Sequence, residues 1–478
     1  MIRIYLDWSI VSYLKTDEYA ELNDFINEHM DKFLFPYSSA HFDDLMKSYS
    51  PENEKFYIDL DRLENLAGRH LLEWDGDNYA MPNITPKEYF SKRMNEKQFS
   101  SIDLLHRLIE DSNKDDLSLL NFGKILKLIY SRIPSGITVN EENSEALKIL
   151  FPGITNESSQ WDLMESVIPF VQKIESENLF YKNFRKQIGD KGLKLPETSA
   201  DWKAEDVFQN IDSFFKTMDA EMTFKKYVEI TVSNLKTEAA TIYDFFTTAY
   251  MLLDMIGYKQ DKLPKPTDTV KNIRTDVEHA FYAASCDYFV VADKFLTQKT
   301  KVLYKEFDIS TKVISPKSMI EELKTTIHYA DKKEHLITEA FGLVKSGTLI
   351  ETIDKDEAQD IDYNILIYKL SVFHFNFFTH ADYVDSSEDD VVCIEFYRPY
   401  SKYYSFVFYN ELENLFDRIM SYFGSEHIED LKNRKKEFVY NADKHIFRWQ
   451  YNFGIVQFQR DDITNQPRLL YAIKSNLH

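Results

Sequence analysis

The chain begins with a short apolar segment that ends in an acidic residue, and this feature limits the possible folds most. Residues 1–7 read MIRIYLD, and the helical pattern SIVSYLK follows after Trp8. A short apolar run that leads directly into a helix is typical of a buried strand in a parallel sheet. A buried carboxylate is costly unless something compensates it, but at the carboxyl end of such a strand it lies where open α/β sheets bind ligands. We therefore predict that Asp7 belongs to a site at the edge of a sheet.

The alternation of short strands and helices continues beyond Asp7 and returns later in the chain. The segment FLFPYSS is predicted to form a second short strand, and AHFDDLMKSY a helix. Further along, YFVVA and TKVIS are typical of strands, and helical patterns lie on both sides of YFVVA. We therefore predict an α/β core with a parallel central sheet, built from residues 1–50 and 237–325.

Two further regions complete the predicted organisation. Residues 51–236 are mostly helical in pattern, without strand alternation of comparable strength, and we predict a long helical insertion there. Residues 326–478 contain strand-like segments such as DVVCIEFYRPY and YYSFVFY, the helical segment NELENLFDRIMSYF and a closing hairpin. This last region is predicted to be a C-terminal α+β domain.

Aromatic residues are concentrated in the predicted C-terminal domain. Their spacing follows strand alternation, which favours a place in a core over base stacking with nucleic acid. The residues concerned are Phe373, Phe375, Phe377, Phe378, Tyr403, Tyr404, Phe406, Phe408, Trp449 and Tyr451.

Charge and cysteine content narrow the classes of partner and compartment. The net charge of −22 argues against broad, salt-dependent attachment to nucleic acid, although it is compatible with a carboxylate-rich metal site. Cys286 and Cys393 lie far apart without metal-ligand spacing, which favours a reducing compartment. No leader and no apolar run long enough to cross a bilayer is visible, so we expect a cytoplasmic protein without membrane attachment.

Two local basic stretches run against the acidic total. A solvated helix face is the favoured explanation for each, and guidance of a phosphate backbone is the alternative. The stretches consist of Lys182, Arg185, Lys186, Lys191 and Lys194, and of Lys432, Arg434, Lys435 and Lys436.

Four acidic residues share a context that favours metal binding. Asp7 and Asp293 each follow a predicted strand, so they emerge at the same edge if the two strands lie side by side in parallel. Asp44 lies in the first turns of the helix after the second strand, and Asp276 precedes the helix VEHAFYAAS. Clustered carboxylates raise their own pKa values unless cations neutralise them. Hard oxygen ligands suit Mg²⁺ or Mn²⁺, and such ions support phosphodiester hydrolysis by an activated water.

Three stretches carry these acids and Ser9: IYLDWSIVSYL, PYSSAHFDDLMKS and DVEHAFYAASCDYFVVADKFLTQK. They resemble the motifs of PIN-domain nucleases, over well under half of the chain. The resemblance implies an α/β/α sandwich, Mg²⁺ or Mn²⁺ as the metal, RNA as the usual substrate, and products with a free 3′ hydroxyl and a 5′ phosphate. It assigns the catalytic and metal-ligand positions to Asp7, Asp44, Asp276 and Asp293. Ser9 matches a hydroxyl position that supports the metal site.

Several of these acids also have a structural explanation. Asp7, Asp276 and Asp293 are each candidates for the N-cap of a following helix, because an aspartate there accepts backbone N–H bonds. For each of them, the presence of the other motifs favours metal ligation.

The neighbouring residues leave alternatives open as well. Asp43 competes with Asp44 for the second ligand position, and the two point about 100° apart on a helix. His279 either contacts the substrate or packs in the interior, and packing is favoured for Tyr282. A structural or exposed role is favoured for His41.

Other enzyme classes that place an aspartate after a first strand are disfavoured. Haloacid-dehalogenase-like phosphatases and DEDD exonucleases need an acid two residues later, where this chain has Ser9. No glycine-rich phosphate loop and no nucleophile elbow is visible.

The sequence therefore predicts a metal-dependent PIN-like endonuclease, acting on RNA, with bacterial toxicity or phage defence as the context by analogy. The alternative is a weakly active or inactive PIN-like scaffold that binds proteins through its insertion or its C-terminal domain. The choice between RNA and DNA, the oligomeric state and the existence of a regulating partner stay open.

Overall fold

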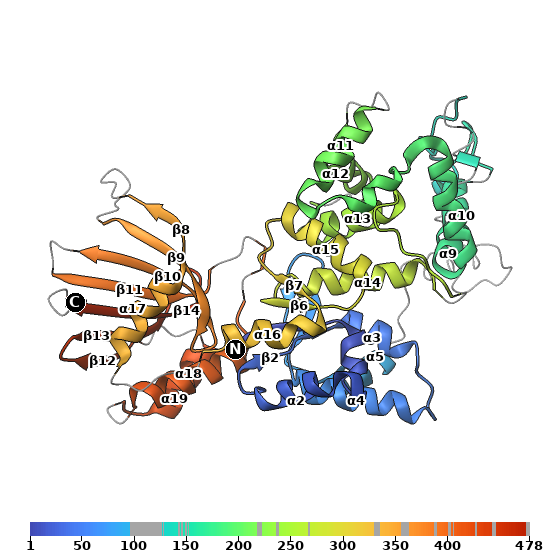
Figure 1. Cartoon of the computed structure of the whole chain (residues 1–478). Helices are drawn as coiled ribbons and strands as arrows, with labels where there is room; N and C mark the ends of the chain where they lie inside the picture. Colours follow the sequence, from blue (N-terminus) through green and yellow to red (C-terminus); the bar gives the residue numbers. More distant parts are fainter. Residues whose placement is uncertain are drawn as a thin grey trace. The chain divides into compact units, whose positions relative to one another are not determined.

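The structure is a computed structural model of the whole chain, shown in Figure 1. It describes residues 1–95, 127, 129–141, 144, 147–148, 151, 153–217, 222–235, 239–265, 268–328, 335–354, 363–386, 390–399, 403–404, 406–425, 428–441 and 446–474. The chain divides into two compact units, one formed by Met1–Pro86 with His279–His478 and the other by Lys87–Glu278.

A four-stranded parallel sheet lies in the first unit. Its strands, in spatial order, are β2 (Phe33–Leu34), β1 (Ile2–Leu6), β6 (Tyr288–Val290) and β7 (Lys312–Ile314). Strand β1 is buried along its whole length, as expected for an interior strand of a parallel sheet. The predicted α/β character with a parallel sheet is therefore confirmed, and the first strand pairs in parallel with the strand of the YFVVA segment.

Helices connect these strands. Those of this part of the unit are α1 (Trp8–Tyr13), η1 (Asp17–Tyr19), α2 (Ala20–Glu28), α3 (Ser39–Met46), α4 (Glu54–Ala67), α15 (Lys294–Glu306) and α16 (Pro316–Thr326). Their start signals are local: Ser315 caps α16 by accepting the N–H of Ser318, and Pro316 occupies the first helical position. Helices α1, α3 and α4 pack against one another, and α16 packs against α2.

The segment FLFPYSS is two strands rather than the single strand that the sequence predicted. After β2, strand β3 (Tyr37–Ser38) pairs in parallel with β4 (Leu71–Trp74), which pairs with β5 (Tyr79–Ala80) in a second sheet. Pro36 separates β2 from β3, and a proline cannot donate to a ladder because it lacks a backbone N–H. Strands β4 and β5 were not predicted, since they lie within the region assigned to a helical insertion.

The regular elements that the structure describes in the second unit are helices. Its elements are α9 (Gln160–Ser176), α10 (Asn178–Ile188), η2 (Gly189–Leu193), η3 (Glu197–Asp201), η4 (Ala204–Asp206), α11 (Val207–Lys216), α12 (Phe224–Leu235) and α13 (Ile242–Met255). Helices α5 (Pro86–Asn95) and α14 (Val270–Ala283) cross its borders. The bounds of this unit differ from those of the predicted insertion, residues 51–236.

The first basic stretch is only partly a solvated face. Arg185 is buried and forms an ion pair with Asp254, with 2.7 Å between Nη1 and Oδ2. The Nζ of Lys182 donates to the carbonyl oxygen of Leu263. The prediction of a solvated position is therefore wrong for Arg185. The local charge pattern could not reveal the ion pair, because the partner lies far away in sequence.

The C-terminal part of the first unit contains a seven-stranded antiparallel sheet (Figure 1). In spatial order its strands are β12 (Phe447–Tyr451), β13 (Gly454–Arg460), β14 (Pro467–Lys474), β11 (Val391–Tyr397), β10 (Phe378–Ser386), β9 (Ile365–His374) and β8 (Thr348–Ile353). Helices α17 (Leu336–Ser346), α18 (Tyr409–Phe423) and α19 (Leu431–Tyr440) share one apolar core with the sheet. Buried and partly exposed residues alternate along β11 and β14, so one face of these strands is covered.

The aromatic residues of this region confirm the prediction that most of them are core. Phe375, Phe377, Phe378 and Trp449 belong to the apolar cluster, with Tyr451 packed against it. The predicted strand YYSFVFY is wrong in its described residues: Tyr409 begins α18, and the carbonyl oxygen of Phe406 accepts a hydrogen bond from Arg3 instead of a neighbouring strand. No helix among the described residues has both the length and the apolar character needed to span a membrane.

Candidate functional site

Asp7 lies at the carboxyl end of β1, between that strand and α1. Leu6 is in register with Val290 of β6, and the Asp7 N–H donates to the Val290 carbonyl oxygen over 2.9 Å. Asp7 occupies the N-cap position of α1, but its side chain makes no capping hydrogen bond. Its Oδ2 instead accepts a short hydrogen bond from the Ser9 hydroxyl. The carboxylate is therefore available for a role other than capping.

The environment of Asp7 opposes its negative charge. Only 7% of the residue is exposed. Burial raises the pKa of the carboxyl group, and the nearby negative charge of Asp44 raises it further, while His279 and Ser9 act in the opposite direction. The ionised form of Asp7 is thus only partly compensated by the groups around it.

Asp44 has the opposite environment, although it is also largely buried. Its Oδ2 lies 3.1 Å from Nε2 of His279, and its Oδ1 accepts a hydrogen bond of 2.6 Å from Nζ of Lys47, the C-cap residue of α3. Burial alone would raise the pKa of Asp44, but His279 and Lys47 outweigh it and lower the pKa to about 2. Asp44 is therefore an ionised carboxylate at neutral pH.

A buried polar network fixes the position of His279. Its Nδ1 lies 2.9 Å from the Tyr5 hydroxyl, which also contacts Oγ of Ser38 at 2.6 Å. His279 is fully buried, and the charge of Asp44 requires the proton of its ring on Nε2. The tyrosine and the carboxylate therefore hold the two ring nitrogens from opposite sides.

His41 has a structural role in this network, in agreement with the prediction. Its Nδ1 accepts the backbone N–H of Ser38 over 3.1 Å, and its Nε2 donates to the carbonyl oxygen of Leu6 over 2.9 Å. Burial, followed by the nearby His279, lowers the pKa of His41 to about 3. The ring is therefore neutral and ties α3 to the end of β1.

Asp293 is placed at the same sheet edge as Asp7 by the parallel pairing of β1 and β6. Its Oδ1 accepts the N–H groups of Phe295 and Leu296 over 2.7 and 2.8 Å. The aspartate is exposed and is the N-cap of α15. The structural explanation weighed for this residue therefore applies, and its predicted role as a metal ligand stays a prediction.

The sequence predicted that Asp276 precedes a helix. In the structure, Asp276 lies inside α14 instead. That helix starts at Val270, where Thr269 and Asn272 form the cap: Oδ1 of Asn272 accepts the Thr269 N–H over 3.0 Å. The N-cap explanation for Asp276 is therefore wrong, because the helix already starts upstream, at the T-x-x-N signal of Thr269 and Asn272. Its assignment as a ligand stays a prediction.

The structure brings Asp7, Asp44 and His279 within electrostatic reach of one another, with Ser9 bonded to Asp7. Tyr282 is buried, as predicted, and its hydroxyl accepts a hydrogen bond from Ser39. The four predicted ligands do not form a group of three or more whose ligand atoms lie within 4.8 Å of one another.

Sequence reasoning missed three members of this site: Tyr5, Ser38 and Lys47. Lys47 could have been found, since a lysine three residues after an aspartate on a helix shares its face. Tyr5 gave no signal, because an aromatic residue within an apolar strand is ordinary core in most proteins.

Searches with this chain gave no matching family model, no matching curated protein and no matching solved structure.

Proposed function

We propose that this protein is a metal-dependent nuclease whose site lies at the carboxyl edge of the parallel sheet, around Asp7 and Asp44. The observation that carries the proposal is the pair itself: a buried carboxylate whose charge is incompletely compensated, beside a second carboxylate that is firmly ionised. Two such groups, one at the end of a central parallel strand and one on the adjacent helix α3, favour a bound cation over an apolar or neutral ligand.

The donor atoms at this edge fit a hard divalent cation. Asp7, Asp44 and Ser9 supply oxygen atoms, which Mg²⁺ and Mn²⁺ prefer. An ion bound here would supply Lewis-acid stabilisation of phosphate charge and a more acidic water.

The chain's own residues have distinct roles in this proposal. Ser9 orients the Asp7 carboxylate, and His279 keeps Asp44 ionised and fixed in position. Asp293 and Asp276 complete the ligand set by their resemblance to the PIN-domain motifs. The proposal includes the finer fold assignment, a PIN-like α/β/α sandwich, which the parallel sheet order and the flanking helices support.

RNA is the proposed substrate, on the basis of the resemblance. Self-limiting toxicity or phage defence in the cytoplasm is the proposed context. The net charge of −22 disfavours extended contact with nucleic acid outside the site. The helical unit and the C-terminal sheet are therefore proposed to bind a protein partner.

The test is cleavage of single-stranded and structured RNA and DNA by the purified full-length chain with Mn²⁺, Mg²⁺ or EDTA. We expect metal-dependent cleavage that falls by at least about 100-fold in Asp7→Asn and Asp44→Asn, the scale of loss when a group that stabilises transition-state charge is removed. Asp24→Asn is the matched control, because Asp24 is exposed on α2 and the change in charge is the same.

Cleavage at equal rates in all variants would place the activity elsewhere or in a contaminant. No cleavage of any substrate by the parent chain would leave the binding scaffold as the function to pursue. Asp43→Asn separates the two candidates for the second ligand: the proposal expects it to retain activity that Asp44→Asn loses.

A further inference from the structure

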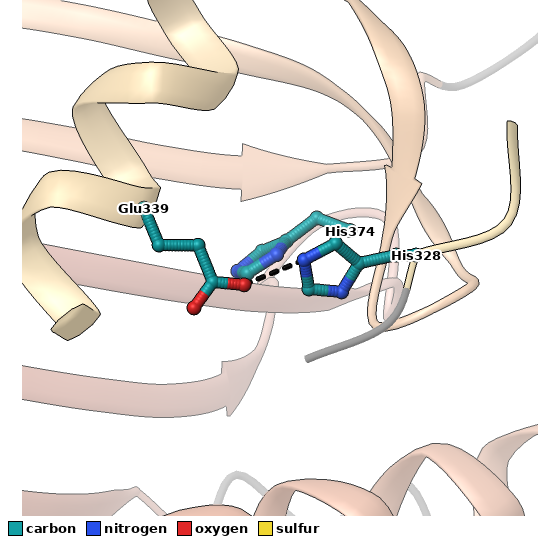
Figure 2. Close-up of side chains that lie close together, drawn as sticks. All are labelled: His328, Glu339 and His374. Atoms are coloured by element: carbon teal, nitrogen blue, oxygen red, sulfur yellow. Dashed lines mark ion pairs between the residues drawn. The ribbon is translucent and has the colours of Figure 1, made fainter. Parts of the chain in front are cut away.

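Three metal-ligating side chains converge in the C-terminal part of the chain, away from the parallel sheet. Figure 2 shows His328, Glu339 and His374 pointing toward one another. Each offers one ligand atom, and these atoms all lie within 4.8 Å of one another. Among the residues that the structure describes, this is the one group of three or more His, Cys, Asp or Glu side chains that meets this distance.

Backbone pairing explains why the two histidines meet. Ile327 forms an isolated parallel bridge with Phe373, so the following residues, His328 and His374, lie side by side. Their ring centroids are 4.9 Å apart. Glu339 comes from α17, and its Oε1 lies 2.6 Å from Nε2 of His328. The three ligands therefore come from three separate segments.

The His374 ring contains an unpartnered nitrogen. The residue is 2% exposed, and its Nδ1 is buried without a hydrogen-bond partner. A buried polar atom without a partner is costly and needs an explanation. Burial, followed by His328, holds the pKa of His374 well below its usual range, so the ring is neutral and keeps a lone pair for a ligand.

Surrounding groups hold all three side chains in place. The Tyr471 hydroxyl lies 3.2 Å from Nε2 of His374, and the Tyr422 hydroxyl donates to Oε2 of Glu339 over 3.1 Å. Asn376 binds the backbone of His328 through both of its amide atoms. Outer partners of this kind orient the ligands of protein metal sites.

We propose that His328, Glu339 and His374 bind one divalent transition-metal ion of the zinc class. Two imidazole nitrogens and one carboxylate suit Zn²⁺, Co²⁺ or Fe²⁺, whereas Mg²⁺ and Ca²⁺ prefer oxygen atoms alone. The ion would link α17 to the end of β9 and to the segment after α16. This site is independent of the proposed nuclease site.

Ligand geometry sets the adjustment that binding requires. Bond lengths to zinc of about 2.0–2.2 Å keep atoms on one ion within roughly 4 Å of each other. The observed separations, at most 4.8 Å, exceed this limit by less than about 1 Å.

Ligation by His328 also requires a change of tautomer. Its Nδ1 accepts the N–H of Phe375 over 3.3 Å, a long hydrogen bond, so Nε2 carries the proton that faces Glu339. Binding a metal through Nε2 moves the ring proton to Nδ1 and costs the long hydrogen bond from the Phe375 N–H. The expected affinity is therefore lower at acidic pH, as for any imidazole site.

The experiment is a titration of the full-length, EDTA-treated and desalted protein with Co²⁺, followed by its visible d–d absorption, and then with Zn²⁺ in competition. We expect one Co²⁺ per chain at the His328, Glu339 and His374 site, which Zn²⁺ displaces, and a rise in the unfolding temperature with Zn²⁺. Glu339→Gln and His374→Gln are expected to lower the affinity by more than about 100-fold, because changes in outer partners alone cost about 10–100-fold.

Three matched variants separate this site from others. His380→Gln and Glu351→Gln change the same residue types elsewhere in the sheet and should leave the Co²⁺ spectrum unchanged. Asp7→Asn tests for signal from the parallel-sheet edge and should also leave it unchanged. If His374→Gln does not fold, the near-isosteric Glu339→Gln decides. Absence of binding by the parent chain, or equal binding by parent and Glu339→Gln, would overturn the proposal.

Discussion

The imidazole Nε2 of His279 lies 3.1 Å from Oδ2 of Asp44, although 235 positions separate the two residues in the chain. The contact joins α14 to α3 across the end of the parallel sheet. It makes Asp44 the strongly ionised member of the acidic pair and leaves Asp7 as the carboxylate whose charge the fold opposes. The following predictions on stability depend on this difference and on three further contacts.

Neutralising the two aspartates should change stability in opposite directions in metal-free protein. The folded-state pKa of Asp44 is lowered, so its ionised form contributes stability above about pH 4, which is lost as the pH falls toward 2. Asp44→Asn should lose roughly 2 kcal/mol at pH 7. The folded-state pKa of Asp7 is raised, so its ionised form costs stability at pH 7, and Asp7→Asn should stabilise the protein.

Urea denaturation in EDTA at pH 7 and at a series of pH values down to 2 measures both effects. The deficit of Asp44→Asn should shrink as the pH falls from about 4 to 2, because the carboxylate of the unfolded chain is protonated first and that of the folded chain only near pH 2. A loss of stability in Asp7→Asn would contradict the incomplete compensation of that carboxylate.

Tyr5→Phe should destabilise the protein by about 1–3 kcal/mol. The hydroxyl contacts Ser38, His41 and His279, and removing it leaves buried polar atoms without that partner. The looser His279 should also raise the pKa of Asp44, which a carboxylate NMR titration can follow. Unchanged Asp44 titration would show that His279 is held by other contacts.

Breaking the ion pair of Arg3 and Glu411 should cost about 3–5 kcal/mol, because a buried charge would lose its partner. Nη2 of Arg3 lies 2.7 Å from Oε2 of Glu411, and Glu411 is fully buried. Burial alone would raise the pKa of Glu411, but Arg3 is the main group that lowers it to about 2. Denaturation of Glu411→Gln measures the loss.

The double variant Arg3→Met with Glu411→Leu is the control for this prediction. It should be more stable than Glu411→Gln, since replacing both buried charges by apolar groups removes their desolvation cost. A double variant that is no better would show that losing the hydrogen bond from Arg3 to the Phe406 carbonyl offsets the gain from removing both buried charges.

Gly454→Ala should destabilise the protein by about 3 kcal/mol or more. Gly454 has a φ of +150°, and a Cβ there would overlap the carbonyl oxygen of Ala472 on the neighbouring strand. Gly342→Ala is the matched control: nothing lies near its Cβ position in α17, so the change should stabilise the helix by about 0.5–1 kcal/mol. Thermal unfolding of both variants tests the pair, and equal effects would contradict the steric argument.

The sequence determined the local elements and their order. The run before Asp7, in which Arg3 is the single polar residue, and the YFVVA segment are strands because their residues are otherwise apolar and β-prone, and their neighbours are helices because of periodicity and caps. The segment DVVCIEFYRPY was likewise predicted to be a strand, and the structure buries one face of it. Each of these signals is contained within a few neighbouring residues, and this is why a single sequence was enough to find them.

Only the tertiary structure decided which of the chemically active residues meet. His279 belongs with Asp44, and His328 belongs with Glu339 and His374, because distant segments are paired by strands and packing rather than by spacing. The same is true of Pro36, which divides one apparent strand between two sheets. Burial, charge compensation and ligand geometry depend on distances between segments, and local sequence patterns carry no information about those distances.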